Sequence, residues 1–420
     1  MTPSWSVDAS ALPSSLTWLV PFGLFGAISW GVWLLRKVLS ATSRPTVNEF
    51  ETSVSVVVPS FHEDPDVLMR CLATWRHQAP DRILIVLDVA DTEAQRRIEA
   101  LGDPTVEAVM FQHRGKRSAL GVGMRMVDTE LVVLVDSDTA WDEGLLAAVQ
   151  MPFADPAIGA VSTRQNVYRP STSIWRRVAD WIIDLRYCDY APAMGRFGGV
   201  ICASGRTAAY RSSVVLPRIA DLEHEIFLGR ECIAGDDGRL TWLVLSQGYR
   251  VGHQDSARAL SMFPDTFRAF VKQRIRWSRN SYRCYLTAIR NGWIFRVPFI
   301  SQLTVMQILF TPVTMAVAMT YVVLSLRSEH PGATLGLACS WLMIGRGIRS
   351  LSHLRRRPQD IWLLPLVSVV VAFIALPIKV YALVTMNKQG WLTRTDDSIG
   401  GEGQSEKSVT VPDTTPEVAR

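Results

Sequence analysis

The candidate catalytic residues of this 420-residue sequence lie in two acidic pairs and in one basic, aromatic stretch. Asp136 and Asp138 directly follow the apolar run Leu131–Val135. Because they lie two positions apart at the end of a predicted strand, both carboxylates can face the same side. Such a pair suits Mg²⁺ or Mn²⁺, hard cations that also take phosphate oxygens. An ordinary turn after a buried strand is the alternative, since Asp and Ser favour turns.

A second acidic pair, Asp236 and Asp237, precedes the predicted helix Gly238–Ser246. One of the two can cap this helix while the other faces a cleft. A carboxylate near a second one and near bound phosphate is a candidate general base, whereas a plain helix cap explains the same residues. Lys116 and Arg117 open another predicted helix, where they either neutralise a diphosphate or form a solvated helix end.

The stretch QRIRW lies in a basic, aromatic helix predicted from about Pro264 to Arg290. Gln273, Arg276 and Trp277 share one helical face, because they are spaced i, i+3 and i+4. Arg276 can reach a phosphate and Trp277 can stack on a sugar ring. Such a sequence is typical of a helix that lies on an anionic membrane surface. Binding to nucleic acid is the competing interpretation, but the adjoining apolar spans argue against it, so we expect no nucleic acid partner.

These residues must be positioned by a body predicted between about Ser53 and Gln254. Short β-rich runs with amphipathic helices between them predict an α/β fold with a mostly parallel sheet. The runs are Val54–Val58, Ile83–Val89, Val106–Met110 and Leu131–Val135. Ligands of such folds bind at the carboxyl ends of the strands, where Glu63, Asp88 and Asp136 lie. No GxGxxG follows the first run, so a mononucleotide fits better than a dinucleotide.

Apolar segments near both ends of the chain predict attachment to a membrane. Leu16 to Leu35 is long enough to span a bilayer, and Arg36 and Lys37 place the following residues in the cytoplasm. A cleaved signal peptide is the alternative, but no positive charge precedes the run. Lys379 and two prolines in the last of the later stretches predict a re-entrant or interfacial segment there. These later stretches are about Val297–Leu326, Ala333–Ile348 and Ile361–Met386.

In their order along the chain, DSD at Asp136–Asp138, GDD at Gly235–Asp237 and QRIRW resemble the signature of the processive membrane-bound glycosyltransferases of family 2. The similarity runs from about Val54 to Arg394. VVPSFHEDPDVLMRCL, RGKRSAL and LPIKVYALVTMNKQGWLTR resemble hyaluronan synthase most closely, and chitooligosaccharide and cellulose synthases are related. The chain departs from the family pattern at Arg206, where the family usually has Pro, and at Leu392, which replaces the Gly of WGT.

The resemblance implies a GT-A-like nucleotide-sugar-binding fold and inverting transfer from UDP-sugar donors to a growing polysaccharide acceptor. Asp237 would be the catalytic base, and Asp136 and Asp138 would bind Mg²⁺ or Mn²⁺. The other substrate-binding residues would be Glu63, Asp88 at the uracil, Lys116 at the diphosphate, Asp236, Gln273, Arg276 and Trp277 on the acceptor side, and Trp391, Thr393 and Arg394 over the bound donor. Hyaluronan would require UDP-GlcNAc and UDP-glucuronate. A chitin-like oligosaccharide, or transfer of one sugar to a lipid carrier, is the alternative.

Composition fits a catalytic body with a minority of membrane helices, since 48% of the residues are hydrophobic and the net charge is +5. Scattered cysteines indicate a reduced, cytosolic catalytic region. We therefore expect a multi-pass plasma-membrane protein that contacts membrane lipids. Its expected parts are an anchor and linker (1–50), a cytosolic GT-A-like domain (51–263), an interfacial helix region (264–296), C-terminal membrane helices with the WLTR segment (297–394) and a disordered tail (395–420).

Overall fold

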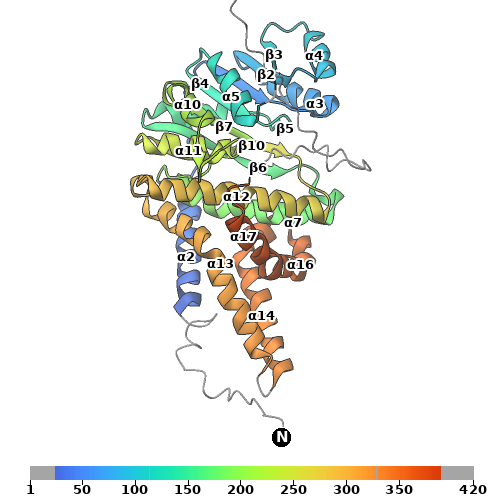
Figure 1. Ribbon diagram of the computed structural model, residues 1–420, viewed down its shortest axis with the longest axis vertical. Coiled ribbons are helices and arrows are strands. Elements are labelled where there is room, and N and C mark those ends of the chain that lie inside the picture. The colour runs from blue at the N-terminus through green and yellow to red at the C-terminus, as the bar shows by residue number, and fades with distance from the viewer. Residues whose placement is uncertain (1–23, 113, 328–329, 389–420) are drawn as a thin grey trace, which may run out of the picture.

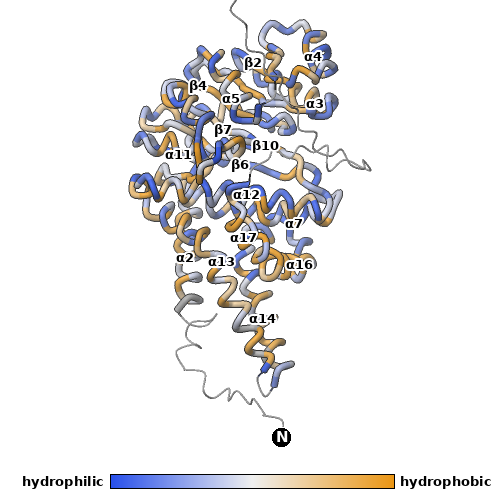
Figure 2. Tube along the Cα trace, in the orientation of Figure 1, coloured by the Kyte–Doolittle hydropathy of each residue, from blue (hydrophilic) through white to orange (hydrophobic). Residues whose placement is uncertain are grey.

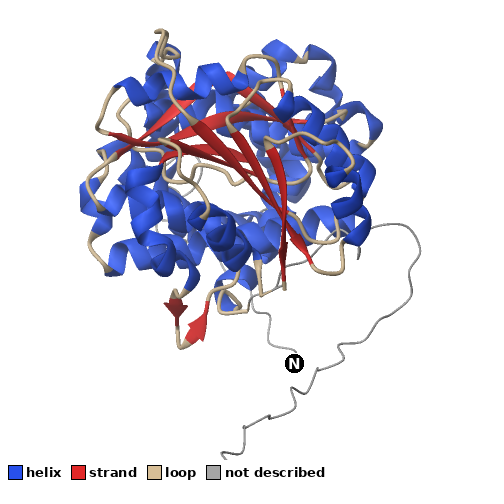
Figure 3. Ribbon diagram, turned by 90° about the horizontal axis from the view of Figure 1, so that it is seen from above, coloured by secondary structure: helices blue, strands red, loops and turns tan. Residues whose placement is uncertain are grey.

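An eight-stranded sheet and a set of long helices beneath it make up the protein (Figure 1). The computed structural model describes residues 24–112, 114–327 and 330–388. The strands lie in the order β3-β2-β1-β4-β7-β6-β10-β5. Figure 3 shows the sheet from above as a twisted layer with helices on both sides. The structure confirms the predicted α/β class, and the site described below lies at the carboxyl ends of its parallel strands.

The first half of the sheet is parallel and confirms the strands predicted from the apolar runs. Its members are β1 (Val54–Pro59), β2 (Arg82–Asp88), β3 (Val106–Phe111) and β4 (Leu131–Val135). Every residue of β1 is buried, because helices cover both faces. Alternate side chains of these strands therefore enter two separate hydrophobic cores. The connecting helices are α3 (Pro65–Arg76), α4 (Thr92–Glu99) and α5 (Lys116–Arg125).

The second half of the sheet is mixed. β7 (Thr207–Arg211) runs antiparallel to β4 and to β6 (Ile158–Val167), whereas β10 (Arg250–Ser261) runs parallel to β6 and pairs with the short β5 (Thr139–Trp141). β6 buries polar side chains that are satisfied by hydrogen bonds, such as Thr163 Oγ1 to the Thr207 carbonyl at 2.6 Å. The remaining elements here are α6 (Leu145–Gln150), α8 (Ala191–Gly195), α9 (Ser212–Val215), α10 (Ile219–Glu223), α11 (Asp236–Ser246), and the hairpin β8 (Ile226–Phe227) and β9 (Arg230–Glu231).

Two amphipathic helices lie under the sheet, α7 (Ile174–Leu185) and α12 (Phe267–Arg290) (Figure 1). The range of α12 is close to the one predicted from the sequence. Ser173 caps α7 and Thr266 caps α12, each accepting from a backbone N–H of the first turn. Trp181 of α7 is fully buried and donates from Nε1 to Ser350 Oγ at 2.8 Å. The underside of α7 therefore packs on protein at this point.

The helices farthest from the sheet are apolar (Figure 2). Long members are α2 (Leu24–Thr42), α13 (Phe299–Ser325) and α14 (Pro331–Arg349), followed by α15 (Leu351–Arg356), α16 (Leu364–Val369) and α17 (Ala375–Val384). Among the described residues, two stretches are long and apolar enough to cross a membrane, Phe299–Thr320 and Pro358–Val384, which suggests association with a membrane. The part of the predicted anchor before residue 24 and the predicted disordered tail lie outside the described residues.

The last apolar stretch differs in shape from the long helices. It consists of a 3₁₀ turn at Pro358–Leu363, α16, a π-helical turn at Val370–Ile374 and α17. Figure 1 shows α16 and α17 folded directly below α7 and α12, whereas α13 and α14 extend much farther. At its end, Arg283 Nη1 on α12 donates to the Met386 carbonyl at 2.6 Å. The stretch thus returns the chain to the underside of the α/β body.

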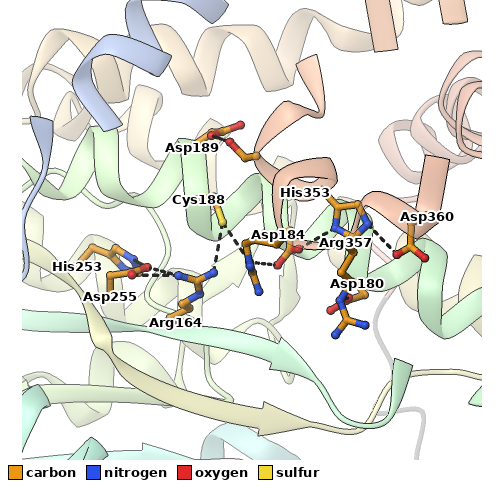
Figure 4. A network of polar contacts seen from close by, with 12 residues as sticks. Arg164, Asp180, Asp184, Cys188, Asp189, His253, Asp255, His353, Arg357 and Asp360 are labelled. Carbon is orange, nitrogen blue, oxygen red and sulfur yellow. Dashed lines mark hydrogen bonds and ion pairs between the residues drawn. The ribbon is translucent and has the colours of Figure 1, made fainter. Parts of the chain in front are cut away.

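A buried polar network fastens α7 to the chain after α14 (Figure 4). His353 Nδ1 lies 2.7 Å from Asp184 Oδ2, and Nε2 lies 3.0 Å from Asp360 Oδ2. The imidazole is fully buried, with its centroid 4.6 Å from that of Trp181. Burial, together with the Asp184 charge, raises the pKa of Asp180 to about 6. Asp180, Asp184 and His353 are close enough together to hold a metal. However, the guanidinium groups of Arg177, Arg356 and Arg357 already form ion pairs with the carboxylates of the cluster. We therefore interpret the cluster as an ion-pair network.

Candidate active site

One lysine joins two acidic motifs that lie far apart in the sequence. Lys116 is the first residue of α5, Asp136 follows β4, and Asp236 is the first residue of α11. The Lys116 Nζ lies 2.7 Å from Asp136 Oδ1 and 3.0 Å from Asp236 Oδ2. The alternative of a solvated helix end is therefore wrong, because the lysine is directed into the acidic site. Arg117 is also buried and donates to the Gly235 carbonyl.

The charges in this triad shift one another's protonation. Burial alone would lower the pKa of Lys116, but the adjacent Asp136 and Asp236 carboxylates raise it above its ordinary value. Burial acts in the opposite sense on Asp236, yet the Lys116 ammonium holds the pKa of that carboxyl below its usual range. Lys116 and Asp236 are therefore both ionised at neutral pH, and the lysine lies where it could neutralise a phosphate oxygen.

Asp237 lies beside the triad at the start of α11. The N-cap of this helix is Gly235, at φ +82°, so the prediction that an aspartate caps it is wrong. Both aspartates instead occupy the first turn, where the helix dipole favours negative charge. Asp237 Oδ1 accepts from the Gly238 N–H at 2.8 Å, and Oδ2 lies 3.6 Å from Cys202 Sγ. Burial, followed by the Asp237 charge, raises the pKa of Cys202 to about 12, so the neutral thiol can donate to this carboxylate.

The other predicted acidic residues lie at or after the ends of the strands β1, β2 and β4. Ser137 Oγ donates to Glu63 Oε2 at 3.0 Å, which brings together the segments that follow β1 and β4. Asp88, at the end of β2, is 8% exposed and accepts from the Ala90 N–H. Asp138 accepts from Thr139 Oγ1 at 3.3 Å. The pair Asp136 and Asp138 presents only hard oxygen donors, so the residues present fit Mg²⁺ or Mn²⁺.

A cavity of about 560 Å³ begins at this site and continues between the lower helices. Lys116, Asp136 and Asp237 line one end, and residues of α13 and α17, including Thr311 and Ile378, line the other. The acidic site and the apolar helices thus share one compartment.

The residues of α12 that were predicted to bind the acceptor are only partly brought together. Arg276 and Trp277 line the cavity, and the Trp277 ring stands edge-on to Phe263 with centroids 6.1 Å apart. Gln273 is not among the described residues that line it, and its Oε1 is buried without a hydrogen-bond partner. Trp391, Thr393 and Arg394 lie outside the described residues.

Sequence reasoning missed two lining residues, Cys202 and Arg186. Arg186 Nη2 donates to the Cys202 carbonyl at 3.1 Å. Arg186 directly follows the amphipathic sequence Ile174–Leu185, and this position was the available signal for it. No feature of the sequence distinguishes Cys202 from the other cysteines.

Comparison with known proteins decides the family. The family described as "Glycosyltransferase like family 2" matches residues 52–280, which is more than half of the chain. The chain belongs to this family. The match contains DSD, GDD and QRIRW, so all three motifs that form the site lie within it.

Relatives of this glycosyltransferase carry a more specific name. It is 28% identical over 397 residues to an N-acetylglucosaminyltransferase of Sinorhizobium fredii, covering 90% of this chain and 94% of the relative. It is also 28% identical to an N-acetylglucosaminyltransferase of Azorhizobium caulinodans, over 81% of this chain and 87% of the relative. A mannosyltransferase from Pyrobaculum calidifontis, solved with GDP-mannose and Mn²⁺, has a TM-score of 0.59 at 21% identity and covers 83% of this chain and 96% of its own. That likeness confirms the GT-A-like fold.

Proposed function

We propose that this glycosyltransferase transfers N-acetylglucosamine from UDP-GlcNAc to a hydroxyl of a growing β-linked chain. The observation that carries the proposal is the cavity that joins Asp237 to the apolar helices α13 and α17. A soluble transferase needs only a donor and acceptor cleft, whereas a compartment that continues between membrane helices suits a product that leaves through them. The name of the relatives supports the choice of sugar. It favours a chitooligosaccharide-like product over our first expectation, hyaluronan.

On the donor side, Asp88 would contact the uracil and Glu63 would support the loop that carries the metal ligands. Asp136 and Asp138 would hold Mg²⁺ or Mn²⁺, and the mannosyltransferase of similar fold was solved with Mn²⁺. A divalent ion bound there supplies positive charge that stabilises a departing diphosphate. Lys116 is already ionised between Asp136 and Asp236, so it can add a second positive charge at the same place.

On the acceptor side, Asp237 takes the proton of the attacking hydroxyl. The hydroxyl oxygen forms a bond to C1 of the sugar, the bond between C1 and the phosphate oxygen breaks, and its electron pair leaves with UDP. Attack on the face opposite the leaving group inverts C1 and gives a β-linkage. Trp277, at the cavity wall, would stack on the acceptor sugar, and Arg276 would stabilise the leaving group with Lys116. Asp236 holds Lys116 in position.

We also propose that the enzyme is a multi-pass plasma-membrane protein with a cytosolic catalytic body. Exposed apolar side chains on α13, such as Phe310 at 52% and Val313 at 56%, support contact with lipid. The folded-back path of α16 and α17, together with the bond from Arg283 to Met386, supports a re-entrant last segment. Such a segment ends on the catalytic side, which is where Trp391, Thr393 and Arg394 must be to fold over the bound donor.

The substitution Asp237→Asn tests the proposed function in isolated membranes. Release of UDP from UDP-GlcNAc in the presence of Mn²⁺ should fall roughly 100- to 10,000-fold, because general base catalysis is lost. Asp221→Asn, at an exposed position on α10, serves as the control and should behave like the wild type. Near-wild-type turnover of Asp237→Asn would refute the assignment. Product size on a gel separates a polymer from a single sugar on a lipid carrier.

A further inference from the structure

Positive charge dominates the cavity beyond the site around Lys116. The carboxylates that line it among the described residues are Asp136, Asp236 and Asp237, and Lys116 pairs with the first two. Six further cationic side chains line the same space, namely Arg186, Arg206, Arg274, Arg276, Arg346 and Lys379. Because like charges repel strongly where the dielectric constant is low, this cavity is an unfavourable place for any further cation.

Arg274, on α12, has hydrogen-bond donors that lack an acceptor. Its Nε and Nη2 are buried and make no hydrogen bond with any described residue. Its guanidinium carbon lies 4.9 Å from the ring centroids of both Phe270 and Trp277. A buried donor that stays unpaired is costly, so the natural complement of these N–H groups is an acceptor atom on a bound ligand.

Arg206, directly before β7, approaches the same tryptophan from another element. Its guanidinium carbon lies 4.0 Å from the Phe263 ring centroid and 4.9 Å from that of Trp277. Two guanidinium groups therefore lie beside the ring that is proposed to stack on the acceptor sugar. Arg206 replaces the usual Pro of the family, and Arg274 occupies a variable position of QxxRW, so the family signature assigns a role to neither.

The protonation of both arginines shows that this place already disfavours positive charge. Burial, followed by the charges of Arg206 and Arg186, lowers the pKa of Arg274 to about 9. Burial is also the main reason that the pKa of Arg206 falls to about 10, although the Asp136 charge acts in the opposite sense. The same burial and the same neighbouring cations would act against the ammonium group of a bound amino sugar.

We propose that Arg206 and Arg274 select the acceptor by the substituent at C2 of its terminal sugar, binding an acetamido group and excluding a free amino group. This inference rests on the proposed function, which places the acceptor sugar on Trp277. The carbonyl oxygen of an acetamido group is a neutral acceptor for the unpaired N–H groups of Arg274. A free amine is largely protonated at neutral pH, so it cannot accept these bonds and adds a positive charge beside two guanidinium groups.

The arginines thereby discriminate in two ways. Arg274 supplies a hydrogen bond that only an acceptor atom can complete, and both arginines repel a cation. The diphosphate of the donor is the other group that could accept from them, but in the proposed mechanism Lys116, Arg276 and the metal ion serve it. The enzyme would therefore extend N-acetylated chain ends and leave deacetylated ends unextended.

Three acceptors that differ only at C2 of the non-reducing sugar test the inference. They are a chitooligosaccharide that ends in N-acetylglucosamine and the same oligosaccharide ending in glucose or in glucosamine. With UDP-GlcNAc and Mn²⁺, wild-type kcat/KM should be roughly 10-fold lower for the glucose end, because a hydrogen bond to a charged donor is lost. It should be roughly 100-fold lower for the glucosamine end, whose charge is repelled as well. Mass spectrometry of the extended oligosaccharides measures the three rates.

Variants assign this discrimination to the two arginines. Arg206→Gln should narrow the gap between the glucose and glucosamine ends, because one cation is lost, and should keep the preference for N-acetylglucosamine over glucose. Arg274→Gln should reduce both differences, because it removes the charge and the buried donors together. Arg290→Gln, on an exposed position of α12, should keep all wild-type ratios.

The outcomes separate the inference from the proposed function. The inference requires that the wild type prefers N-acetylglucosamine to glucose and glucose to glucosamine. Any other order overturns it and leaves N-acetylglucosamine transfer standing, even if the variants do not fold. Full wild-type discrimination in both variants also overturns it, as does a rise in KM for UDP-GlcNAc that is equal with all three acceptors, which would assign the arginines to the diphosphate. Failure of the wild type to extend any of the three contradicts the proposed function, and the inference with it.

Discussion

Replacing Lys116 with Gln should destabilise the protein in a way that depends on pH. The Lys116 side chain is 17% exposed and pairs with Asp136 at 2.7 Å and with Asp236 at 3.0 Å. Removing one member of a buried ion pair costs about 3–5 kcal/mol, because the remaining charge is left uncompensated. Asp136 keeps some access to water, since its side chain is 31% exposed. We therefore expect a loss near the lower limit, about 3 kcal/mol at pH 8.

The pH dependence follows from the sign of the shift at Asp236. In the wild type the pKa of this carboxyl lies below its ordinary value of 3.8, so its stabilising contribution is present above that pH and is lost only in stronger acid. Burial is the largest influence on the pKa of Asp236, and it acts to raise it; without the opposing Lys116 ammonium the pKa should lie above 3.8. The variant is then penalised at pH 8 and regains stability as the pH falls and the carboxyl takes up a proton. The difference from the wild type should therefore be smaller at pH 5.

Urea unfolding of the detergent-solubilised protein measures this difference through tryptophan fluorescence. Lys388→Gln, at an exposed position, is the control and should unfold like the wild type at both pH values. Two results would refute the reasoning: a loss of unfolding free energy that is equal at pH 5 and pH 8, or a loss at pH 8 of less than about 1 kcal/mol. Either would show that the ion pairs of Lys116 do not stabilise the fold.

Two further substitutions test the elements around the site. Gly235→Ala should lower the free energy of unfolding by about 1–3 kcal/mol and reduce UDP release, because φ is +82° and the new Cβ would lie 3.0 Å from Asn280 Cγ. Gly248→Ala is the control: its φ is also positive but its surroundings are open, so it should affect stability alone. His353→Ala should lower the free energy of unfolding by about 3–5 kcal/mol, because its two carboxylate partners are buried, whereas exposed His77→Ala should have little effect. Thermal unfolding checks both, and a loss below about 1 kcal/mol for His353→Ala would contradict a role of the network in stability.

The parallel half of the sheet was predictable because its strands are continuous apolar runs. The strands β6, β7 and β10 were not individually predicted, since buried polar side chains interrupt their pattern. Gln165, for example, is 1% exposed but donates to Thr163 Oγ1 at 2.7 Å, so its polarity is satisfied inside the sheet. Hydrophobic periodicity cannot detect a strand whose interior contacts are hydrogen bonds.

The candidate site was predictable as a set of motifs but not as a geometry. The sequence predicts acidic pairs at a strand end and near a helix start, whereas the lysine that joins them comes from a third element. The Asp184–His353–Asp360 network could not be predicted at all, because Asp184 and His353 are 169 residues apart. Arg206 and Arg274 each place the guanidinium carbon 4.9 Å from the Trp277 ring centroid, but in the sequence they were visible only as one departure from a family motif and as part of a basic helix. Their meaning depends on which side chains surround them.

The buried network between α7 and the chain after α14 joins the proposed membrane helices to the proposed active site. Trp181 lines the cavity and its ring contacts His353, so the network supports part of the cavity wall. Dissolved salt screens buried ion pairs only weakly, and concentrated salt will therefore not loosen this wall. Lateral pressure on the apolar helices, by contrast, reaches the wall through rigid contacts. Bilayer thickness and lipid composition should consequently influence turnover even when donor concentration is saturating.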